Sequence, residues 1–416
     1  MTESPTMNRA ATPDSLVTTI PGSALPGRFY TDPEVYAAEL KSVFAHSWQA
    51  VGHISDLPAA GSRIVARIGV DEVVVVRDEG GVLRAFRNVC RHRGTRLVQG
   101  AETAEAIRCP YHGWTYRLDG RFLGAPEARL IPCLDKDKIG LLAAQVGTLA
   151  GFIFVNLDVN APSLAEQTEG LAERVAAYTS QPMEVIGKSR LYDSANAMGQ
   201  NANWKISVDN YLEGYHVPSA HPGLMRLLDY QRYSAEIHNG YVWVDAPLRD
   251  EPSKNRTERL YQRLVSPIPG LPAEEERVWH YALIYPNTAL EFYPDHIYAW
   301  TMIPDGVGRV VMPEAAYRPV GTSTRTRIAQ RVNAAINKVV SHEDEMIVER
   351  QQVGLATPGY RCGPLSRREI AVSWFAEKVR TDLAPMGIID PDATSTSTSE
   401  PTSTSAPTAS TPSGDN

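Results

Sequence analysis

The sequence of 416 residues predicts an α+β protein, in which a small all-β domain precedes a larger domain that mixes helices and strands. Between about Ser62 and Asn156 the chain consists of short β-branched or aromatic runs, separated by Gly/Asp turns such as DEGG and LDG. From about Ser163 onward, patterns with helical spacing alternate with strand-like runs. The length suits about two or three domains, and the 43% hydrophobic content provides enough material for their cores.

We expect four segments along the chain: a flexible arm over residues 1–25, the β-rich domain with a helical lead-in over 26–160, the α+β domain over 161–390, and a tail over 391–416. The tail is a Ser/Thr/Pro tract with almost nothing to bury, so it should be disordered. The expected strands are 64–69, 73–78, 83–89 and 152–157 in the first domain, and 243–248, 280–286, 289–294 and 297–304 in the second. The expected helices are 164–179, opened by Ser163, and 326–352, the longest.

Charge and hydropathy exclude some classes of partner. The formal net charge is -7 and the pI is near 5.9, which argues against a nucleic-acid partner because binding phosphates needs a basic face. No run of about 18 apolar residues is present, and the N-terminus has no apolar signal-peptide core. We therefore expect a cytoplasmic protein with no membrane span. In a reducing cytoplasm Cys133 and Cys362 should be free thiols, with a disulfide between them as the alternative.

Two short Cys/His pairs form the first candidate metal site. Cys90 and His92 are followed, after sixteen residues, by Cys109 and His112. Gly94 and Gly113-Trp114 follow the two pairs, where the backbone must fold closely around a metal centre. Zinc fingers usually pair Cys with Cys and His with His, whereas each pair here contributes one of each. The mixture suits a [2Fe-2S] cluster with two Cys on one iron and two His on the other, which is the Rieske arrangement.

The segments NVCRHRGTRL and CPYHGWTY resemble the Rieske domain of the Rieske non-haem iron oxygenases, the family of the aromatic-ring-hydroxylating alpha subunits. The resemblance covers most of residues 30–160. It implies that the β-rich domain is a Rieske domain whose cluster carries one electron at a time.

A second metal site is expected in the larger domain. His216 and His221 are five residues apart, and Pro218 should end the helix that carries His216, so that the chain turns back with His221. A redox-active Fe(II) site needs a carboxylate as a third ligand and open positions for O2. The best candidate is Asp344 in SHEDEMIVERQQVG.

Helical geometry predicts which residues near Asp344 face the metal site. Glu343 and Glu345 should point to other faces of the helix, and Gln351, seven residues after Asp344, should share its face and line the site. Two histidines at this spacing, or a charged helix segment, are by themselves ordinarily a surface feature. The Rieske motif upstream is what favours a metal site here.

NWKISVDNYLEGYHVPSAHP also resembles the catalytic-iron segment of the same family. The resemblance implies a helix-grip (START-like) catalytic domain in which mononuclear Fe(II), held by His216, His221 and Asp344, activates O2 beside a small-molecule substrate. It also implies a homotrimer, with or without a small beta subunit, in which the cluster of one subunit lies near the iron of the next. An acidic residue bridges the two centres in the family, and Glu213 is the candidate, although many relatives have Asp there; Asp209 is next in line.

Electrons must come from another protein. GxGxxG is absent from the sequence, so we expect a reductase, a ferredoxin or both to deliver electrons from NAD(P)H, which this chain uses only indirectly.

The substrate pocket should come from YALIYPNTALEFYPDHIYAWTMIP, which contains Tyr281, Tyr285, Phe292, Tyr293, Tyr298 and Trp300. An apolar pocket would suit an aromatic ring that is hydroxylated, and this is our main expectation. An aromatic cage would suit a quaternary or methylated amine, because cation–π attraction holds ammonium groups. The segment NYLEGYHVPSAHP looks somewhat like choline- and carnitine-type oxygenases.

A third possibility is a Rieske electron-transfer protein without oxygenase activity. The expected iron triad argues against it. The iron content distinguishes the two, since an electron carrier would hold about two irons per chain and an oxygenase about three.

Overall fold

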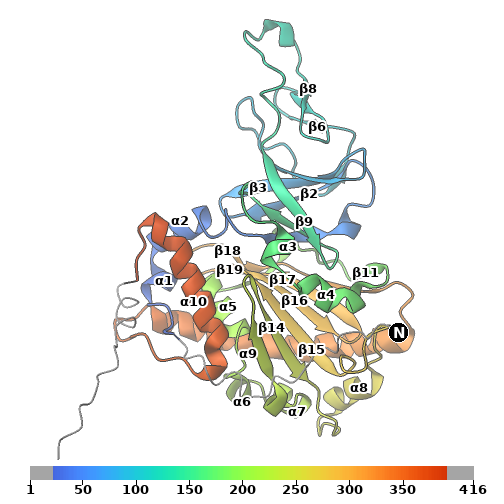
Figure 1. Cartoon of the computed structure of the whole chain (residues 1–416), viewed down its shortest axis with the longest axis vertical. Coiled ribbons are helices and arrows are strands. Elements are labelled where there is room, and N and C mark those ends of the chain that lie inside the picture. The colour runs from blue at the N-terminus through green and yellow to red at the C-terminus, as the bar shows by residue number, and fades with distance from the viewer. Residues whose placement is uncertain (1–21, 391–416) are drawn as a thin grey trace, which may run out of the picture.

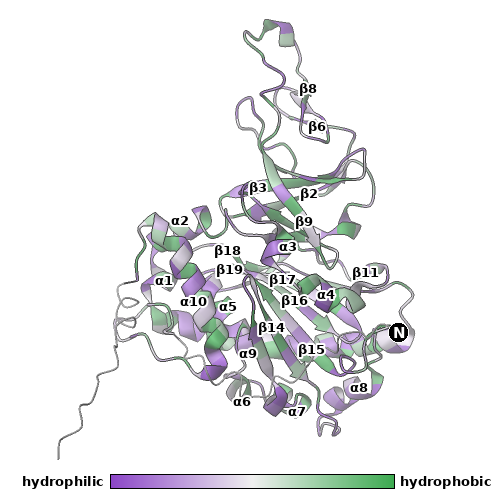
Figure 2. Cartoon of the chain, in the orientation of Figure 1, coloured by the Kyte–Doolittle hydropathy of each residue, from purple (hydrophilic) through white to green (hydrophobic). Residues whose placement is uncertain are grey.

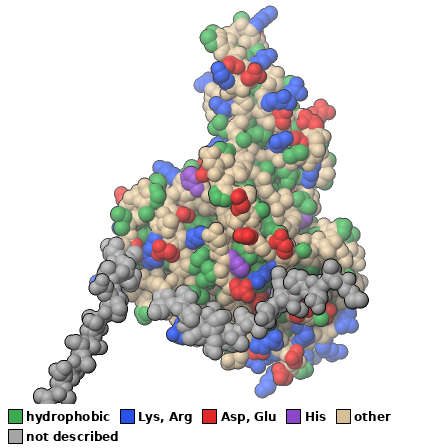
Figure 3. All heavy atoms as spheres, in the orientation of Figure 1, with side chains coloured by type: hydrophobic (Ala, Val, Ile, Leu, Met, Phe, Trp, Pro, Cys, Tyr) green, Lys and Arg blue, Asp and Glu red, His purple; other side chains and the backbone are tan. Residues whose placement is uncertain are grey.

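The computed structural model describes residues 22–390, so the expected tail and most of the expected arm lie outside the described residues. A β-rich first domain stands above a broader second domain, whose large sheet is crossed by one long helix (Figure 1). Within residues 22–390, no helix is long and apolar enough to cross a membrane. On the face seen in Figure 3, acidic and basic side chains are interspersed over the first domain.

The first domain is built on a seven-stranded sheet with the order β1-β10-β9-β4-β3-β2-β5. The strands are β1 (Gln49–His53), β2 (Ser62–Ile68), β3 (Asp71–Arg77), β4 (Leu83–Arg87), β5 (Glu102–Thr103), β9 (Ala143–Leu149) and β10 (Phe152–Asn156). The four strands expected in this domain are confirmed as β2, β3, β4 and β10. Val74 and Val76 of β3 enter one core cluster, and Val73 and Val75 enter another, so both faces of this strand are covered.

A smaller sheet extends the first domain away from the second. It has three strands, β6 (Ile107–Arg108), β7 (Thr115–Tyr116) and β8 (Phe122–Gly124). The loop between β6 and β7 contains the second Cys/His pair, and the loop after β4 contains the first.

The second domain has a seven-stranded antiparallel sheet with the order β11-β20-β17-β16-β15-β14-β13. The strands are β11 (Met183–Ile186), β13 (Ser234–Ile237), β14 (Tyr241–Pro247), β15 (Val278–Ile284), β16 (Thr288–Tyr293), β17 (His296–Thr301) and β20 (Glu314–Pro319). A three-stranded sheet of β12 (Met198–Gln200), β18 (Ile303–Pro304) and β19 (Val310–Met312) adjoins it. The four strands expected here are confirmed, with 297–304 divided between β17 and β18.

The expected long helix is α9 (Thr324–Leu355), which packs on one face of the large sheet. Its Ile336 lies in a core cluster with Trp279 of β15 and Tyr293 of β16. The other helices are α1 (Arg28–Thr31), α2 (Pro33–Lys41), α3 (Leu164–Gln167), α4 (Leu171–Val175), α5 (Trp204–Tyr211), α6 (Val217–Ala220), α7 (Pro222–Leu227), α8 (Arg256–Leu264) and α10 (Ile370–Leu383). Hydrophobic and hydrophilic residues are mixed along the strands of the sheet (Figure 2), although both of its faces are covered.

The prediction of one continuous helix over 164–179 is wrong, because the segment divides into α3 and α4. Ser163 does open α3, with a capping box to Glu166. Gly170 then adopts a φ of 80°, which interrupts the helical pattern before α4 begins. The apolar residues of this segment are still buried, because Leu164 and Leu171 pack against the face of the large sheet opposite α9.

The helical lead-in packs with the second domain. Phe44, which follows α2, contacts Trp204 edge to face with ring centroids 4.9 Å apart. The next residue of α5, the fully buried Lys205, donates to Glu39 of α2 and to Asn203. A buried ion pair of this kind requires both partners, because an isolated buried charge is costly. These contacts fix α5, which leads into the His216 segment.

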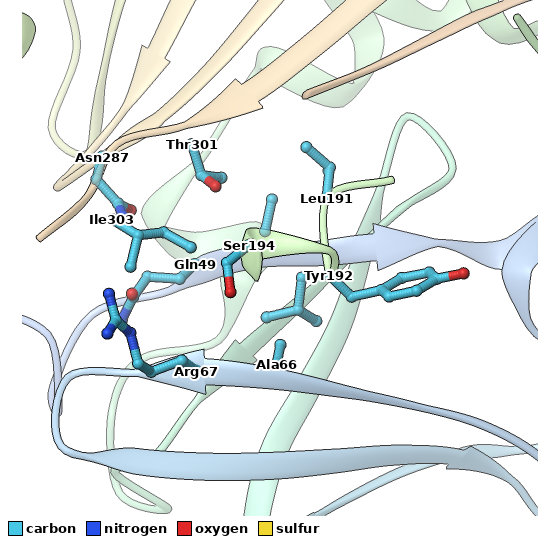
Figure 4. Close-up of a pocket in the computed structure, with 11 residues that line it drawn as sticks. Gln49, Ala66, Arg67, Leu191, Tyr192, Ser194, Asn287, Thr301 and Ile303 are labelled. Carbon is cyan, nitrogen blue, oxygen red and sulfur yellow. The ribbon is translucent and has the colours of Figure 1, made fainter. Parts of the chain in front are cut away.

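Direct contacts also join the two domains. Arg67 of β2 donates to Asp305, at 3.0 Å, and to the carbonyl of Pro304, at 2.7 Å. Beside these bonds lies a small recess, lined by residues from both domains such as Ala66, Ser194 and Thr301 (Figure 4). None of the expected metal ligands lines this recess.

Two candidate metal sites

The two Cys/His loops share one backbone pattern. The N–H of Cys90 donates to the carbonyl of Thr95, and the N–H of Gly94 donates back to Cys90. In the second loop Cys109 bonds to Trp114 in the same way, and Gly113 bonds to Cys109. Gly94 and Gly113 have φ of 72° and 68°, a conformation that strongly favours glycine. The spacing of the sequence motif therefore forms two matched tight loops.

The four side chains are brought together with opposite exposures. Cys90 and Cys109 are buried, whereas the His92 and His112 rings lie at the outer end, with centroids 4.7 Å apart. The indole ring of Trp114 stacks on His92, at 4.7 Å and 5° between planes. The structure thus has a thiol end inside the domain and an imidazole end near the surface.

The surroundings of the two sulfur atoms differ, and they favour the thiolate at Cys109 but not at Cys90. The Tyr116 hydroxyl lies 3.3 Å from Sγ of Cys90. Burial works against the thiolate of Cys109, but backbone N–H groups of His112 and Tyr111 outweigh it and lower the pKa of Cys109. Burial raises the pKa of Cys90, and Tyr116 opposes that shift. This donor set fits a Rieske cluster, in which the buried Cys90 and Cys109 would hold one iron and the outer His92 and His112 would hold the other.

Cys133 and Cys362 lie apart from this set. Cys133 is exposed and Cys362 is partly buried, and no disulfide joins them.

The second site begins where α5 ends. The side chain of Asn203 caps α5 by accepting from the N–H of Lys205. After Tyr211 the chain turns, and the one-turn helix α6 follows. His216 precedes α6 and His221 follows it, so one helical turn separates the two imidazoles and lets them face one another. Asp344 reaches the same point from α9.

Three ligand atoms converge there. Nε2 of His216 lies 3.1 Å from Nε2 of His221. Oδ1 of Asp344 lies 3.0 Å from Nε2 of His221 and 3.7 Å from Nε2 of His216. Among the described residues, this is the group of His, Cys, Asp and Glu side chains whose ligand atoms lie close enough together to hold one ion. The expected triad is thus brought together.

Carboxylates orient both imidazoles from behind. Glu213 Oε1 lies 2.6 Å from Nδ1 of His216, and Glu343 Oε2 lies 2.8 Å from Nδ1 of His221. A proton held at Nδ1 leaves Nε2 free to bind a metal. Burial disfavours the His221 imidazolium, but Asp344 and Glu343 outweigh it and raise the pKa of His221. Such an excess of carboxylates over cations suits a divalent metal ion, and the two-His, one-carboxylate set fits Fe(II).

Several local expectations are corrected. Pro218 does not end a helix that carries His216; it lies in the first turn of α6, where its missing N–H costs nothing. Glu213, the candidate bridging residue, lies in the turn between α5 and α6, and it accepts from the N–H of His216. Glu343 does not point away from the site, since it contacts His221. Gln351 is exposed, and its neighbour Gln352 instead accepts from the N–H of Asn203.

Asn210 was not singled out by the sequence. Its Nδ2 donates to Oδ1 of Asp344 at 2.9 Å, which fixes the carboxylate. The signal was its position six residues before His216 on the helix that leads into the site, but an asparagine in a helix is too common a feature to indicate this contact.

The aromatic residues expected to line the pocket divide between the faces of the sheet. Phe292 packs in the core opposite α9, and Tyr285 donates to Asp382 near α10. The remaining residues expected in the pocket lie on the α9 face: Tyr281, Tyr293, Tyr298 and Trp300. Tyr211 of α5 contacts two of them edge to face, with centroid distances of 5.1 Å to Trp300 and 6.1 Å to Tyr281.

Family models match both domains. Residues 47–135 match the Rieske [2Fe-2S] domain, and residues 183–384 match the ring hydroxylating alpha subunit (catalytic domain). The chain is 32% identical over 343 residues to choline monooxygenase of Beta vulgaris, which covers 81% of this chain and 72% of the relative. It is 38% identical over 219 residues to the carnitine monooxygenase oxygenase subunit of Escherichia coli, which covers 52% of this chain and 57% of that relative's length.

Solved structures show the same architecture. A quaternary ammonium Rieske monooxygenase in complex with L-carnitine is 26% identical, with a TM-score of 0.71 over 88% of this chain and 97% of that chain. Naphthalene 1,2-dioxygenase from Rhodococcus is 20% identical, with a TM-score of 0.69 over 87% of this chain and 94% of that chain, and shares the fold.

Proposed function

The chain belongs to the Rieske non-haem iron oxygenase alpha subunits, and on this premise we propose that it is the terminal oxygenase of a multicomponent monooxygenase acting on a quaternary ammonium compound. The two sites support an oxygenase over an electron carrier, because a carrier has no use for the convergent His216, His221 and Asp344. When bound, the cluster and the mononuclear iron supply electron transfer and O2 activation.

The main structural support for a quaternary ammonium substrate is the edge-to-face arrangement of Tyr211, Tyr281 and Trp300. Tyr211 stands at 88° to Tyr281 and at 87° to Trp300, so rings of different orientation adjoin on the α9 side of the sheet. Ring faces attract ammonium groups, and several rings around one quaternary nitrogen add to that attraction. The relatives named above act on choline and carnitine. The main expectation from the sequence, hydroxylation of an aromatic ring, receives no support from those relatives.

The reaction follows from this assignment. One oxygen atom of O2 enters a C–H bond of the substrate and the other leaves as water, which consumes two electrons and two protons. The electrons come from NAD(P)H through a reductase or ferredoxin. Oxidation at a carbon attached to the nitrogen would release that carbon as an aldehyde, because a carbinol on nitrogen breaks its C–N bond.

Glu213 is proposed to link the two centres. Its carboxylate already contacts Nδ1 of His216, and it would also accept from His112 of the partner subunit in a homotrimer. Asp209, the alternative, is buried and accepts from Tyr30 at 2.7 Å, which leaves it unsuited to reach a partner.

A substrate screen tests the proposal. The purified protein, a surrogate reductase and NAD(P)H are incubated with choline, carnitine, glycine betaine and an aromatic hydrocarbon, and products are identified by mass. We expect one added oxygen or a lost methyl group from a quaternary amine. Product from the aromatic hydrocarbon alone would contradict the substrate class, and no product with any substrate while the cluster turns over would contradict the oxygenase.

A further inference from the structure

A carboxylate is buried among the aromatic residues of the α9 face. Glu291, on the central strand β16, is 8% exposed. Its cross-strand neighbours are Tyr281 on β15 and Tyr298 on β17, so a single acidic side chain lies between two tyrosines on the same face of the sheet. A charged residue in such a place is costly unless something compensates for its charge.

Neutral donors compensate for it only in part. Tyr293 donates its hydroxyl to Oε2 of Glu291 at 2.6 Å, and the Trp300 indole N–H donates to Oε1 at 2.9 Å. A carboxylate oxygen can accept more than one bond, so each oxygen retains capacity. Close by, the hydroxyl of Tyr211 is buried without a hydrogen-bond partner. The cluster therefore keeps polar groups that its own residues do not satisfy.

Helix α9 connects Glu291 to the iron triad. Asn337 of α9 donates to the Tyr293 hydroxyl at 2.7 Å, and that hydroxyl donates to Glu291. Asp344 follows Asn337 by seven residues, so it lies on the same face of the helix about 10 Å along the axis. Tyr281 lies near both carboxylates, since Glu291 and Asp344 each contribute to raising the pKa of Tyr281, after the larger effect of burial. Glu291 thus belongs to the region that faces the triad.

Within residues 22–390, no Arg or Lys side chain forms an ion pair with Glu291. Among the described residues, the buried Arg and Lys side chains are Arg63 and Lys205, which pair with Glu102 and Glu39. Burial raises the pKa of Glu291 by more than its two donors and His296 lower it, and Nδ1 of His296 is itself held by Asp295 at 2.7 Å. The carboxylate of Glu291 therefore lacks a fully compensating cation in the part of the chain that the structure describes.

We propose that Glu291 is a specificity-determining residue, whose carboxylate provides the counter-charge for the ammonium group of the substrate. The rings of Tyr211, Tyr281 and Trp300 contact the alkyl groups on nitrogen, and the carboxylate behind Trp300 selects for positive charge. This inference rests on the proposed substrate class, and it adds a residue whose role differs from that of the rings. An aromatic ring binds a cation and a neutral hydrocarbon of the same shape, whereas a buried carboxylate distinguishes them.

The test compares two ligands of the same shape. Choline and its neutral carbon isostere, in which a tert-butyl group replaces the trimethylammonium group, are titrated into the iron-loaded protein by calorimetry. We expect the wild-type protein to bind choline more tightly. In Glu291→Gln the affinity for choline should fall about tenfold or more, while that for the isostere stays within about twofold, because only the charged ligand loses a Coulomb partner.

A control and a second variant keep the test decisive. Asp245 accepts an indole N–H from Trp243, as Glu291 does from Trp300, but on the opposite face of the sheet, so Asp245→Asn should leave the preference for choline intact. If Glu291→Gln does not fold, Glu291→Leu removes the charge at similar volume.

Equal losses for both ligands in the Glu291 variant would show a structural role and overturn the inference, as would a wild-type protein that does not distinguish the ligands. Failure of the proposed function shows separately, as absence of oxidised quaternary amines in the substrate screen.

Discussion

The carboxylate of Glu343 lies 2.8 Å from Nδ1 of His221, while Oδ1 of the adjacent Asp344 lies 3.0 Å from Nε2 of the same ring. Two consecutive residues of α9 therefore contact opposite sides of one imidazole. In the proposed iron site, Asp344 would act as a ligand, and Glu343 would set the tautomer and orientation of the ligand His221.

Glu343→Ala should lower the affinity of the mononuclear site for Fe(II) by about 10–100-fold, because the His221 ring loses the acceptor that holds it. The Rieske spectrum should not change. Competition with a metal-binding dye measures the affinity. Glu345→Ala is the matched control, since Glu345 contacts the exposed His342 and not the triad. Equal affinities in the wild type and in Glu343→Ala would remove Glu343 from the site.

Glu213→Gln should retain both kinds of iron and normal reduction of the cluster by its partner, yet product formation should fall by about tenfold or more. The reason is that glutamine preserves the shape but not the charge that would link His216 to a neighbouring cluster. Stopped-flow reoxidation of the reduced cluster, measured with substrate and O2, reports the step directly. Wild-type reoxidation and product yield in this variant would show that Glu213 only orients His216.

Asp209→Asn should change how stability depends on pH. Burial, opposed by the Tyr30 bond and by Lys205, raises the pKa of Asp209 from 3.8 to about 7. A folded-state pKa above the unfolded value means that folding takes up a proton between these values, so this residue stabilises the protein at low pH and its contribution is lost as pH rises toward 7. The asparagine mimics the neutral form at every pH.

The melting temperature of Asp209→Asn relative to wild type should therefore increase between about pH 5 and about pH 8. Asp250→Asn is the control, because the Asp250 side chain is 90% exposed. A difference between Asp209→Asn and wild type that does not vary with pH would mean that Asp209 stays ionised in the folded protein throughout this range.

Much of the fold could be predicted because its signals are local. The valine run of β3 and the aromatic runs of β15 to β17 indicate strands because β-branched and aromatic residues favour them, and α9 follows from its apolar spacing. The Cys and His ligands could be predicted for the same reason, since each pair lies on one short segment, as Cys90 with His92 and His216 with His221 do.

The errors arose where contacts are nonlocal or where two local signals compete. Pro218 can end a helix or begin one, and only the position of α6 decides between them. Glu343 was assigned to another helical face because neighbours are separated by about 100° on a helix, but the His221 ring is wide enough to contact both residues. The burial of Glu291 depends on strands and a helix from distant parts of the chain, and no sequence pattern around it indicates that a carboxylate lies there among aromatic rings.

If this single chain holds a Rieske cluster and a separate mononuclear iron, counting iron and acid-labile sulfide per chain shows both most directly. We predict about three irons and about two sulfides in the wild type. Asp344→Ala should retain about two irons, with unchanged sulfide and an unchanged rhombic EPR signal. Cys109→Ser should retain about one iron and lose both the sulfide and the signal. About two irons in the wild type, unchanged in Asp344→Ala, would contradict this prediction and leave an electron-transfer protein.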